Sequence, residues 1–167
     1  MPFSQPVRAL DAAPQLPPLK VANLLSRARL LQHAAMDGNT PLLLRGKNLG
    51  LLCETQSDEA QALFRGAAEA LGARVAVMRS GLSVASTVQE VQDTARVLGR
   101  LYDAVECQGM EAALVARIGQ CAEVPVFDGA ATQGHAVTRL AELLGDETPL
   151  ADNRRFALQA LLLDTIA

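Results

Sequence analysis

The sequence predicts an α/β protein in which a four-stranded parallel sheet is flanked by helices in a three-layer sandwich. Four short apolar runs alternate along the chain with longer segments whose apolar residues recur at helical spacing. Strands that alternate with helices form right-handed strand–helix–strand units, and these units build parallel sheets. Aromatic residues are scarce, with four Phe, one Tyr and no Trp, so Ala and Leu must fill the core, which favours helix-rich layers.

The domain is expected over residues 19–167, after a Pro-rich arm at residues 1–18 that we interpret as extended or mobile. A first helix starts at Leu19 and ends at the turn that begins with Asp37. The strands are predicted at residues 49–53, 74–78, 104–108 and 124–127, and the remaining helices at 57–71, 88–102, 111–120, 137–144 and 152–166. The last helix is expected to have one apolar face, made of Leu158, Leu161, Leu162 and Ile166. Ligands of such sheets bind at the carboxyl ends of the strands.

The loop after the first strand leads directly into a helix, which makes it the first candidate for a binding site. Free backbone N–H groups at a helix N-terminus point at a ligand and favour anions. Ser57 is a good N-cap, and Asp58 and Glu59 follow in the first turn, where carboxylates complement the helix dipole. A backbone suited to anions therefore carries anionic side chains, with neither Arg nor Lys beside them.

Composition and charge exclude several classes of protein. The net charge is −3 and no basic tract occurs, which argues against nucleic-acid binding. No apolar run approaches the roughly 20 residues that span a bilayer, and the N-terminus has no signal-peptide core. Cys53, Cys107 and Cys121 do not form a disulfide or zinc framework, and as buried thiols they suit a reducing cytoplasm. Without a Gly-rich phosphate loop, a Ser-His-Asp grouping or a metal-ligand cluster, we expect no cofactor and no metal.

Three stretches carry a resemblance to a known family. Residues 93–103 read Asp-Thr-Ala-Arg-Val-Leu-Gly-Arg-Leu-Tyr-Asp, residues 46–54 read Gly-Lys-Asn-Leu-Gly-Leu-Leu-Cys-Glu, and residues 124–129 read Val-Pro-Val-Phe-Asp-Gly. The first resembles a characteristic helix of ornithine carbamoyltransferases, a branch of the ornithine/aspartate carbamoyltransferase family, and the other two resemble strands of the same enzymes. With His135 and the helix after it, the resemblance covers roughly residues 19–145, which is the family's N-terminal carbamoyl-phosphate domain.

The end of the chain, residues 151–163, is similar to the closing helix of the same enzymes. In the family a second domain, which binds the amino-acid substrate, separates that helix from the preceding one. Here only residues 145–150 lie between them. The resemblance therefore implies a carbamoyl-phosphate domain that keeps the closing helix at 152–166 and lacks the second domain. That helix is expected to cover apolar surface that the missing domain leaves open.

The resemblance also implies a phosphate site whose residues have changed. The family motif Ser-Thr-Arg-Thr-Arg matches residues 57–61, where only the serine is kept and Glu59 replaces the first Arg. His135 matches the histidine that polarises the carbamoyl carbonyl, and Arg154 matches an Arg that contacts the carbamoyl group. Gln108 stands where the family has a further Arg, and Thr138 where it has Gln. The expected cleft has no assigned catalytic residue and consists of Ser57, Asp58, Glu59, Gln61, Gln108, His135, Thr138 and Arg154.

Each of these residues also has a structural interpretation, which we favour for most of them. For Ser57 we favour an ordinary N-cap over a ligand contact, and for His135 a loop or core histidine over a working one. Asp58 and Glu59 complement the helix dipole without any catalytic partner. An ion pair with Asp58 or Glu59 explains Arg154 at least as well as a ligand contact does.

Three functions stay open. The favoured one is a catalytically inactive carbamoyltransferase-like protein that acts by assembly. It would form a homo-oligomer, with a trimer favoured because the family's enzymes are trimers, or join a true carbamoyltransferase. The second is a small-ligand-binding or sensing module that uses the remodelled cleft for a polar or cationic molecule. The third, ranked last, is a residual carbamoyltransferase, which needs a separate substrate domain and a phosphate site without Arg.

Overall fold

The computed structural model describes residues 16–54 and 58–167. Its strands form one parallel sheet in the order β2-β1-β3-β4, with β1 at Asn48–Cys53, β2 at Arg74–Met78, β3 at Ala104–Gln108 and β4 at Val126–Asp128. The predicted four-stranded parallel sheet is therefore confirmed. The predicted arm up to residue 15 and the predicted N-cap Ser57 lie outside the described residues.

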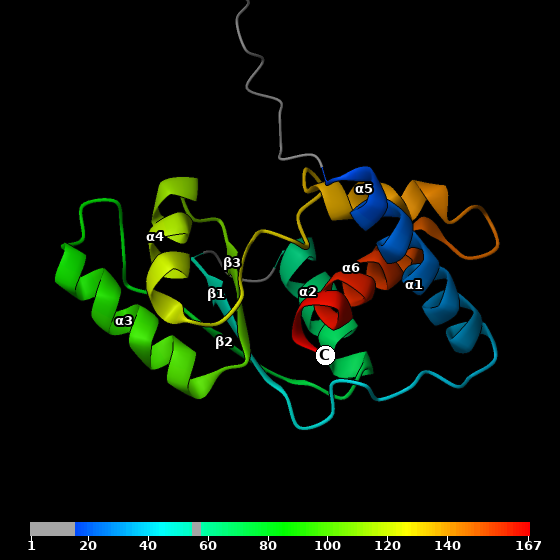
Figure 1. Ribbon diagram of the computed structural model, residues 1–167, viewed down its shortest axis with the longest axis horizontal. Helices are drawn as coiled ribbons and strands as arrows, with labels where there is room; N and C mark the ends of the chain where they lie inside the picture. The colour runs from blue at the N-terminus through cyan, green and yellow to red at the C-terminus, as the bar shows by residue number, and fades with distance from the viewer. Residues whose placement is uncertain (1–15, 55–57) are drawn as a thin grey trace, which may run out of the picture.

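Helices cover both faces of this sheet, as Figure 1 shows. On one face lie α3 (Val88–Leu101) and α4 (Ala112–Ala122), and on the other lie α1 (Pro18–Met36), α2 (Glu59–Ala70), α5 (Ala136–Leu143) and α6 (Leu150–Ile166). Side chains of β1 enter both layers, because successive residues of a strand point to opposite sides. Leu49 and Leu51 pack with α2 and α6, whereas Leu52 packs with α3 and α4. The predicted three-layer sandwich is confirmed.

The strand order reverses at β1, which determines where a ligand site can form. α2 leads from β1 to β2 at one edge, and α3 crosses back to β3 on the other side of β1. Right-handed crossovers in opposite directions place α2 and α3 on opposite faces of the sheet. The carboxyl ends of β1 and β3 lie at this switch in strand order, where open α/β sheets bind their ligands.

The boundaries of several elements follow from local chemistry. β2 and β3 have the predicted bounds, whereas β4 begins later than predicted, since Pro125 has no N–H to donate to a neighbouring strand. α2 begins at Glu59, and its N-cap is Asp58, whose Oδ1 accepts a hydrogen bond from the N–H of Gln61 at 3.0 Å. The N-cap of α2 is therefore Asp58, one residue after the predicted position.

α6 lies at the centre of its helical layer, where it packs against α1, α2 and α5. Every residue from 156 to 163 is buried, and the helix starts at Leu150, ahead of the predicted residue 152. The predicted apolar face is buried, but the burial extends around the whole helix at this point, because neighbouring helices surround the segment. Even Gln159 is buried, and its Nε2 donates to the carbonyl oxygen of Ala67 in α2 at 3.1 Å.

The short connection between α5 and α6 is held by buried polar contacts. Gln32 of α1 donates through Nε2 to the hydroxyl oxygen of Thr148 at 2.9 Å, and that hydroxyl donates to Oδ1 of Asn153. Nδ2 of Asn153 in turn donates to the carbonyl oxygen of Gly145 at 2.9 Å. Because buried polar groups are costly unless paired, these bonds make the connection a specific part of the packed structure.

Candidate functional site

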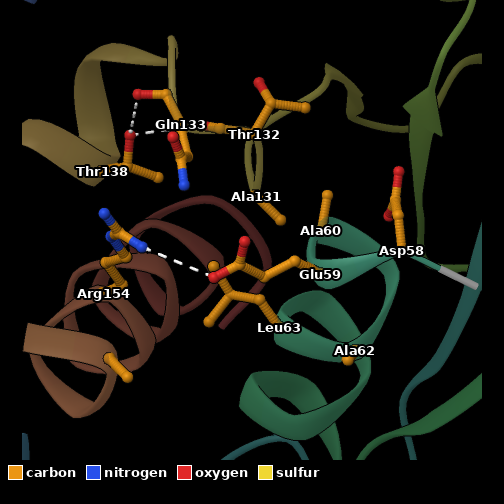
Figure 2. Close-up of a pocket in the computed structure, with 11 residues that line it drawn as sticks. Asp58, Glu59, Ala60, Ala62, Leu63, Ala131, Thr132, Gln133, Thr138 and Arg154 are labelled. Carbon is orange, nitrogen blue, oxygen red and sulfur yellow. Dashed lines mark hydrogen bonds and ion pairs between the residues drawn. The ribbon is translucent and has the colours of Figure 1, made fainter.

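A cleft of about 520 Å³ opens beyond the carboxyl ends of the strands, between three segments of the chain (Figure 2). One wall is the first turn and a half of α2, from Asp58 to Leu63. The opposite wall is the loop after β4, and the start of α6 closes the side. The described lining residues are Asp58, Glu59, Ala60, Ala62, Leu63, Ala131, Thr132, Gln133, Thr138, Ala151 and Arg154. Six of these eleven side chains are polar or charged, but most of the surface that they expose to the cleft is apolar, so the three charged ones determine which ligands can bind.

One ion pair spans the cleft from α6 to α2. Nη1 of Arg154 lies 3.7 Å from Oε1 of Glu59, and Figure 2 shows the two side chains pointing toward each other. The predicted pairing of Arg154 with an acid of the first turn is therefore confirmed, with Glu59 as the partner. The Glu59 side chain is 78% exposed, so solvent screens the pair and its contribution to stability is at most about 1 kcal/mol.

Asp58 and Gln61 belong to the capping interaction of α2. The Asp58 carboxylate faces the cleft and accepts the Gln61 N–H, so it neutralises part of the positive end of the helix dipole. Gln61 contributes only its backbone to this bond, and its side chain does not line the cleft. The Asp58 carboxylate therefore already has a hydrogen-bond partner in its own helix.

Gln108, predicted as a cleft residue, is buried behind the wall. Its Oε1 accepts a hydrogen bond from Sγ of Cys53 at 3.1 Å. Its Nε2 lies 3.0 Å from the carbonyl oxygen of Ala60 and 3.3 Å from Oε2 of Glu106, and it donates to both. Because these bonds occupy the amide, Gln108 joins β3 to the first turn of α2 and does not reach a ligand in the cleft.

His135 is the N-cap of α5 and does not line the cleft. Its Nδ1 accepts a hydrogen bond from the N–H of Val137 at 3.1 Å, which requires a free lone pair on that nitrogen. Burial lowers the pKa of His135, and the nearby Asp128 carboxylate opposes this shift in part. The capping bond and the burial both favour the neutral imidazole. They agree with the interpretation of His135 as a loop or core histidine.

Thr138 does line the cleft, but its hydroxyl serves the loop after β4. Oγ1 lies 2.7 Å from the carbonyl oxygen of His135 and 2.9 Å from that of Gln133. A hydroxyl has one hydrogen to donate, so these carbonyls share it. Thr132 likewise donates to the carbonyl oxygen of Gly129 at 2.6 Å. The two threonines therefore shape this wall more than they offer donors to a ligand.

Glu106, in the middle of β3, is the residue that sequence reasoning missed. Its side chain is fully buried and accepts hydrogen bonds from the N–H groups of Ala130 at 2.9 Å and Ala131 at 3.0 Å. Burial raises the pKa of Glu106 to about 7, and the hydrogen bonds from Ala130, Ala131 and Gln108 limit the rise. The signal was present, since a carboxylate inside a buried strand is tolerated only with partners. Through Gln108, Glu106 connects both walls of the cleft.

Residues 16–54 and 58–167 contain neither a candidate metal site nor a candidate membrane-spanning helix. No three His, Cys, Asp or Glu side chains in that part of the chain are grouped so that they could hold a metal ion. None of its helices combines the length and the apolar character needed to cross a bilayer.

A parallel sheet with a cleft beside a helix N-terminus, at the switch in strand order, defines a class of small-ligand-binding α/β domains. Within this class, residues 10–145 match the family model of the aspartate/ornithine carbamoyltransferase carbamoyl-phosphate-binding domain. The chain belongs to the aspartate/ornithine carbamoyltransferase family, as the resemblance in its sequence implies.

Individual relatives agree with this assignment. The chain is 36% identical over 121 residues to an ornithine carbamoyltransferase of Actinobacillus pleuropneumoniae serotype 5b, a match that covers 72% of this chain and 36% of the relative. It is 34% identical over 125 residues to an ornithine carbamoyltransferase of Haemophilus influenzae, covering 75% of this chain and 37% of the relative. The solved structure of ornithine carbamoyltransferase from Pyrococcus furiosus shares the fold, with a TM-score of 0.64 at 24% identity over 75% of this chain and 40% of that one. The chain therefore spans little more than a third of the length of its relatives.

Proposed function

We propose that this protein is carbamoyltransferase-like but does not transfer carbamoyl groups, and that it acts by binding, as a homo-oligomer or together with a true carbamoyltransferase. The charge of the cleft carries this proposal. Asp58 and Glu59 face it, and Arg154, the one basic side chain among its described lining residues, is already paired with Glu59. A phosphate group would meet a net negative surface, and like charges about 4 Å apart repel by ~1 kcal/mol in water and more in a partly dry site.

The two remaining residues that the resemblance connects with catalysis support the same proposal. Gln108 takes the place of an Arg, and its amide is engaged by Cys53, Ala60 and Glu106. His135 caps α5 and lies outside the cleft lining. Carbamoyl transfer needs preorganised donors at the oxygen atoms on which negative charge develops. Among the described lining residues, Arg154 is the one basic side chain available for that purpose, and it is paired with Glu59.

Uncovered apolar surface supports a role in assembly. The side chains of Val97 and Leu101 on α3 are 53% and 58% exposed and border a groove beside the end of β2. β2 is also an edge strand, and the edge strand of a sheet offers unpaired N–H and C=O groups to another chain. A homotrimer is the assembly that the resemblance implies.

Calorimetric titration with carbamoyl phosphate tests this proposal, on protein whose mass has been determined by light scattering. We expect no heat of binding at micromolar to millimolar ligand, no phosphate release when ornithine is added, and the mass of an oligomer. The Haemophilus influenzae ornithine carbamoyltransferase, measured under the same conditions, is the positive control. Micromolar binding with phosphate release would contradict the loss of activity. The assembly role would be contradicted if light scattering gave the mass of a monomer and if a mixture with the Haemophilus influenzae enzyme showed no complex.

A small-ligand-binding or sensing module is the second candidate, because the cleft stays open in spite of its ion pair. Small-molecule sites typically enclose about 300–1,000 Å³, and this cleft lies within that range. A residual carbamoyltransferase ranks last, since it needs both a separate substrate domain and a phosphate site without free Arg.

A further inference from the structure

We propose that the cleft binds a small zwitterion with an aliphatic side chain, with the ligand's carboxylate on Arg154 and its ammonium group on Glu59. This inference rests on the ligand-binding function proposed for the cleft and names the class of ligand. It does not depend on whether carbamoyl phosphate binds.

The geometry of the ion pair points to this class. Arg154 and Glu59 approach from separate helices on two sides of the cleft, as Figure 2 shows. Their 3.7 Å separation is longer than the roughly 2.8 Å of a close charge-assisted hydrogen bond. The pair is also partly exposed, so it is easily opened. A ligand that enters between the two side chains can replace one long contact with two short ones.

Ligands with a single charge fit less well. An anion would pair with Arg154 but leave Glu59 without its partner, beside the Asp58 carboxylate. A cation would pair with Glu59 and leave the partly buried Arg154 guanidinium without its partner. A zwitterion leaves both of these charges paired. Asp58 needs no ligand, since it accepts the N–H of Gln61.

Most of the remaining surface of the cleft favours an apolar body, although the side chain of Gln133 also lines it. Ala60, Leu63, Ala131 and Ala151 present only methyl and methylene groups. The hydroxyls that could compete for a polar substituent are engaged with loop carbonyls, as described for Thr132 and Thr138. The lining and the charges together therefore favour the aliphatic amino acids over sugars, phosphates and polyamines.

Calorimetry with three matched probes tests the role of each charge. L-Leucine carries both charges, isopentylamine carries the same side chain with the ammonium group only, and 4-methylpentanoate carries it with the carboxylate only. We expect L-leucine to bind at least tenfold more tightly than either analogue, with L-valine and L-methionine close to L-leucine.

Two variants assign each charge to its residue. Glu59→Gln is expected to weaken L-leucine at least tenfold without weakening 4-methylpentanoate, and Arg154→Gln to weaken L-leucine at least tenfold without weakening isopentylamine. Glu69→Gln and Arg155→Gln are the matched controls, because they remove the same charges from exposed ion pairs on the same two helices outside the cleft. Both controls are expected to bind L-leucine as the unmodified protein does.

Three outcomes overturn the inference: no binding of the three amino acids at millimolar concentration, binding no tighter than that of both analogues, or equal binding by the two cleft variants and their controls. The fate of the proposed function is decided separately by carbamoyl phosphate. A protein that binds L-leucine and also releases phosphate from carbamoyl phosphate would keep this inference and reject the loss of activity. A protein that binds neither L-leucine nor carbamoyl phosphate would reject this inference and keep the proposed loss of activity.

Discussion

Glu106 is expected to make the protein less stable as the pH rises from 5 to 8. Burial raises its pKa in the folded chain to about 7, from an ordinary value of 4.5. Between these two values the folded chain holds a proton that the unfolded chain has released, so raising the pH favours unfolding. The contribution of Glu106 is complete below the unfolded pKa and is lost as the pH passes the folded pKa. With about 1.4 kcal/mol per pKa unit, the loss between pH 5 and pH 8 is about 2 to 3 kcal/mol.

The variant Glu106→Gln isolates this effect, because its amide does not titrate. We expect the free energy of unfolding of the unmodified protein, minus that of the variant, to fall by about 2 to 3 kcal/mol from pH 5 to pH 8. Urea denaturation followed by circular dichroism at several pH values measures this difference, in which other titrating groups cancel. Glu69→Gln, exposed on α2, controls for the change in net charge. A difference that stays constant with pH would show that Glu106 does not titrate in this range.

Gly99→Ala is expected to lower the free energy of unfolding by about 2 to 3 kcal/mol. A Cβ at Gly99 would collide with the backbone carbonyl oxygen of Ala122, where α3 meets α4. The obstacle is backbone, so no side-chain rotation relieves it, and the two helices would have to separate. Separation would loosen the core between them, which includes Val91, Leu98 and Ile118. Overpacking of this kind outweighs the gain of up to about 1 kcal/mol that Ala brings over Gly within a helix.

Gly66→Ala is the matched control, since Gly66 lies within α2 and a Cβ there meets no atom within 4 Å. This variant is expected to gain about 0.5 to 1 kcal/mol from helix propensity alone. Chemical denaturation of the two variants should therefore place them about 3 kcal/mol apart. Equal stabilities would mean that α3 and α4 can adjust to the added methyl group without loss of packing.

Local pattern was sufficient for the elements of the fold but not for their ends or surroundings. β2 and β3 follow directly from short apolar runs. Ser57 and Asp58 are nearly equivalent as N-caps, so local reasoning could not choose between them, and the structure selects Asp58. Periodicity also suggested one apolar face for α6, whereas three neighbouring helices bury residues 156–163 completely.

The candidate site was also predicted only in part, because local sequence does not show which groups the fold brings together. The pairing of Arg154 with Glu59 could be anticipated, because the resemblance placed both residues in one cleft and their charges are opposite. The bonds of Gln108 and His135 could not, since a polar side chain pairs with whichever group the fold brings within about 3 Å. Glu106 escaped notice because its partners, Ala130 and Ala131, are backbone groups of another segment.

The sequence by itself determined the class of fold, the family, and the presence of two acidic residues at the start of α2, because hydrophobic periodicity and residue identity are properties of the chain alone. Only the tertiary structure decided which polar side chains face the cleft and which hold its walls together. Hydrogen bonds and burial depend on groups that are distant in sequence, and folding alone brings Arg154 to Glu59 and Glu106 to the loop after β4.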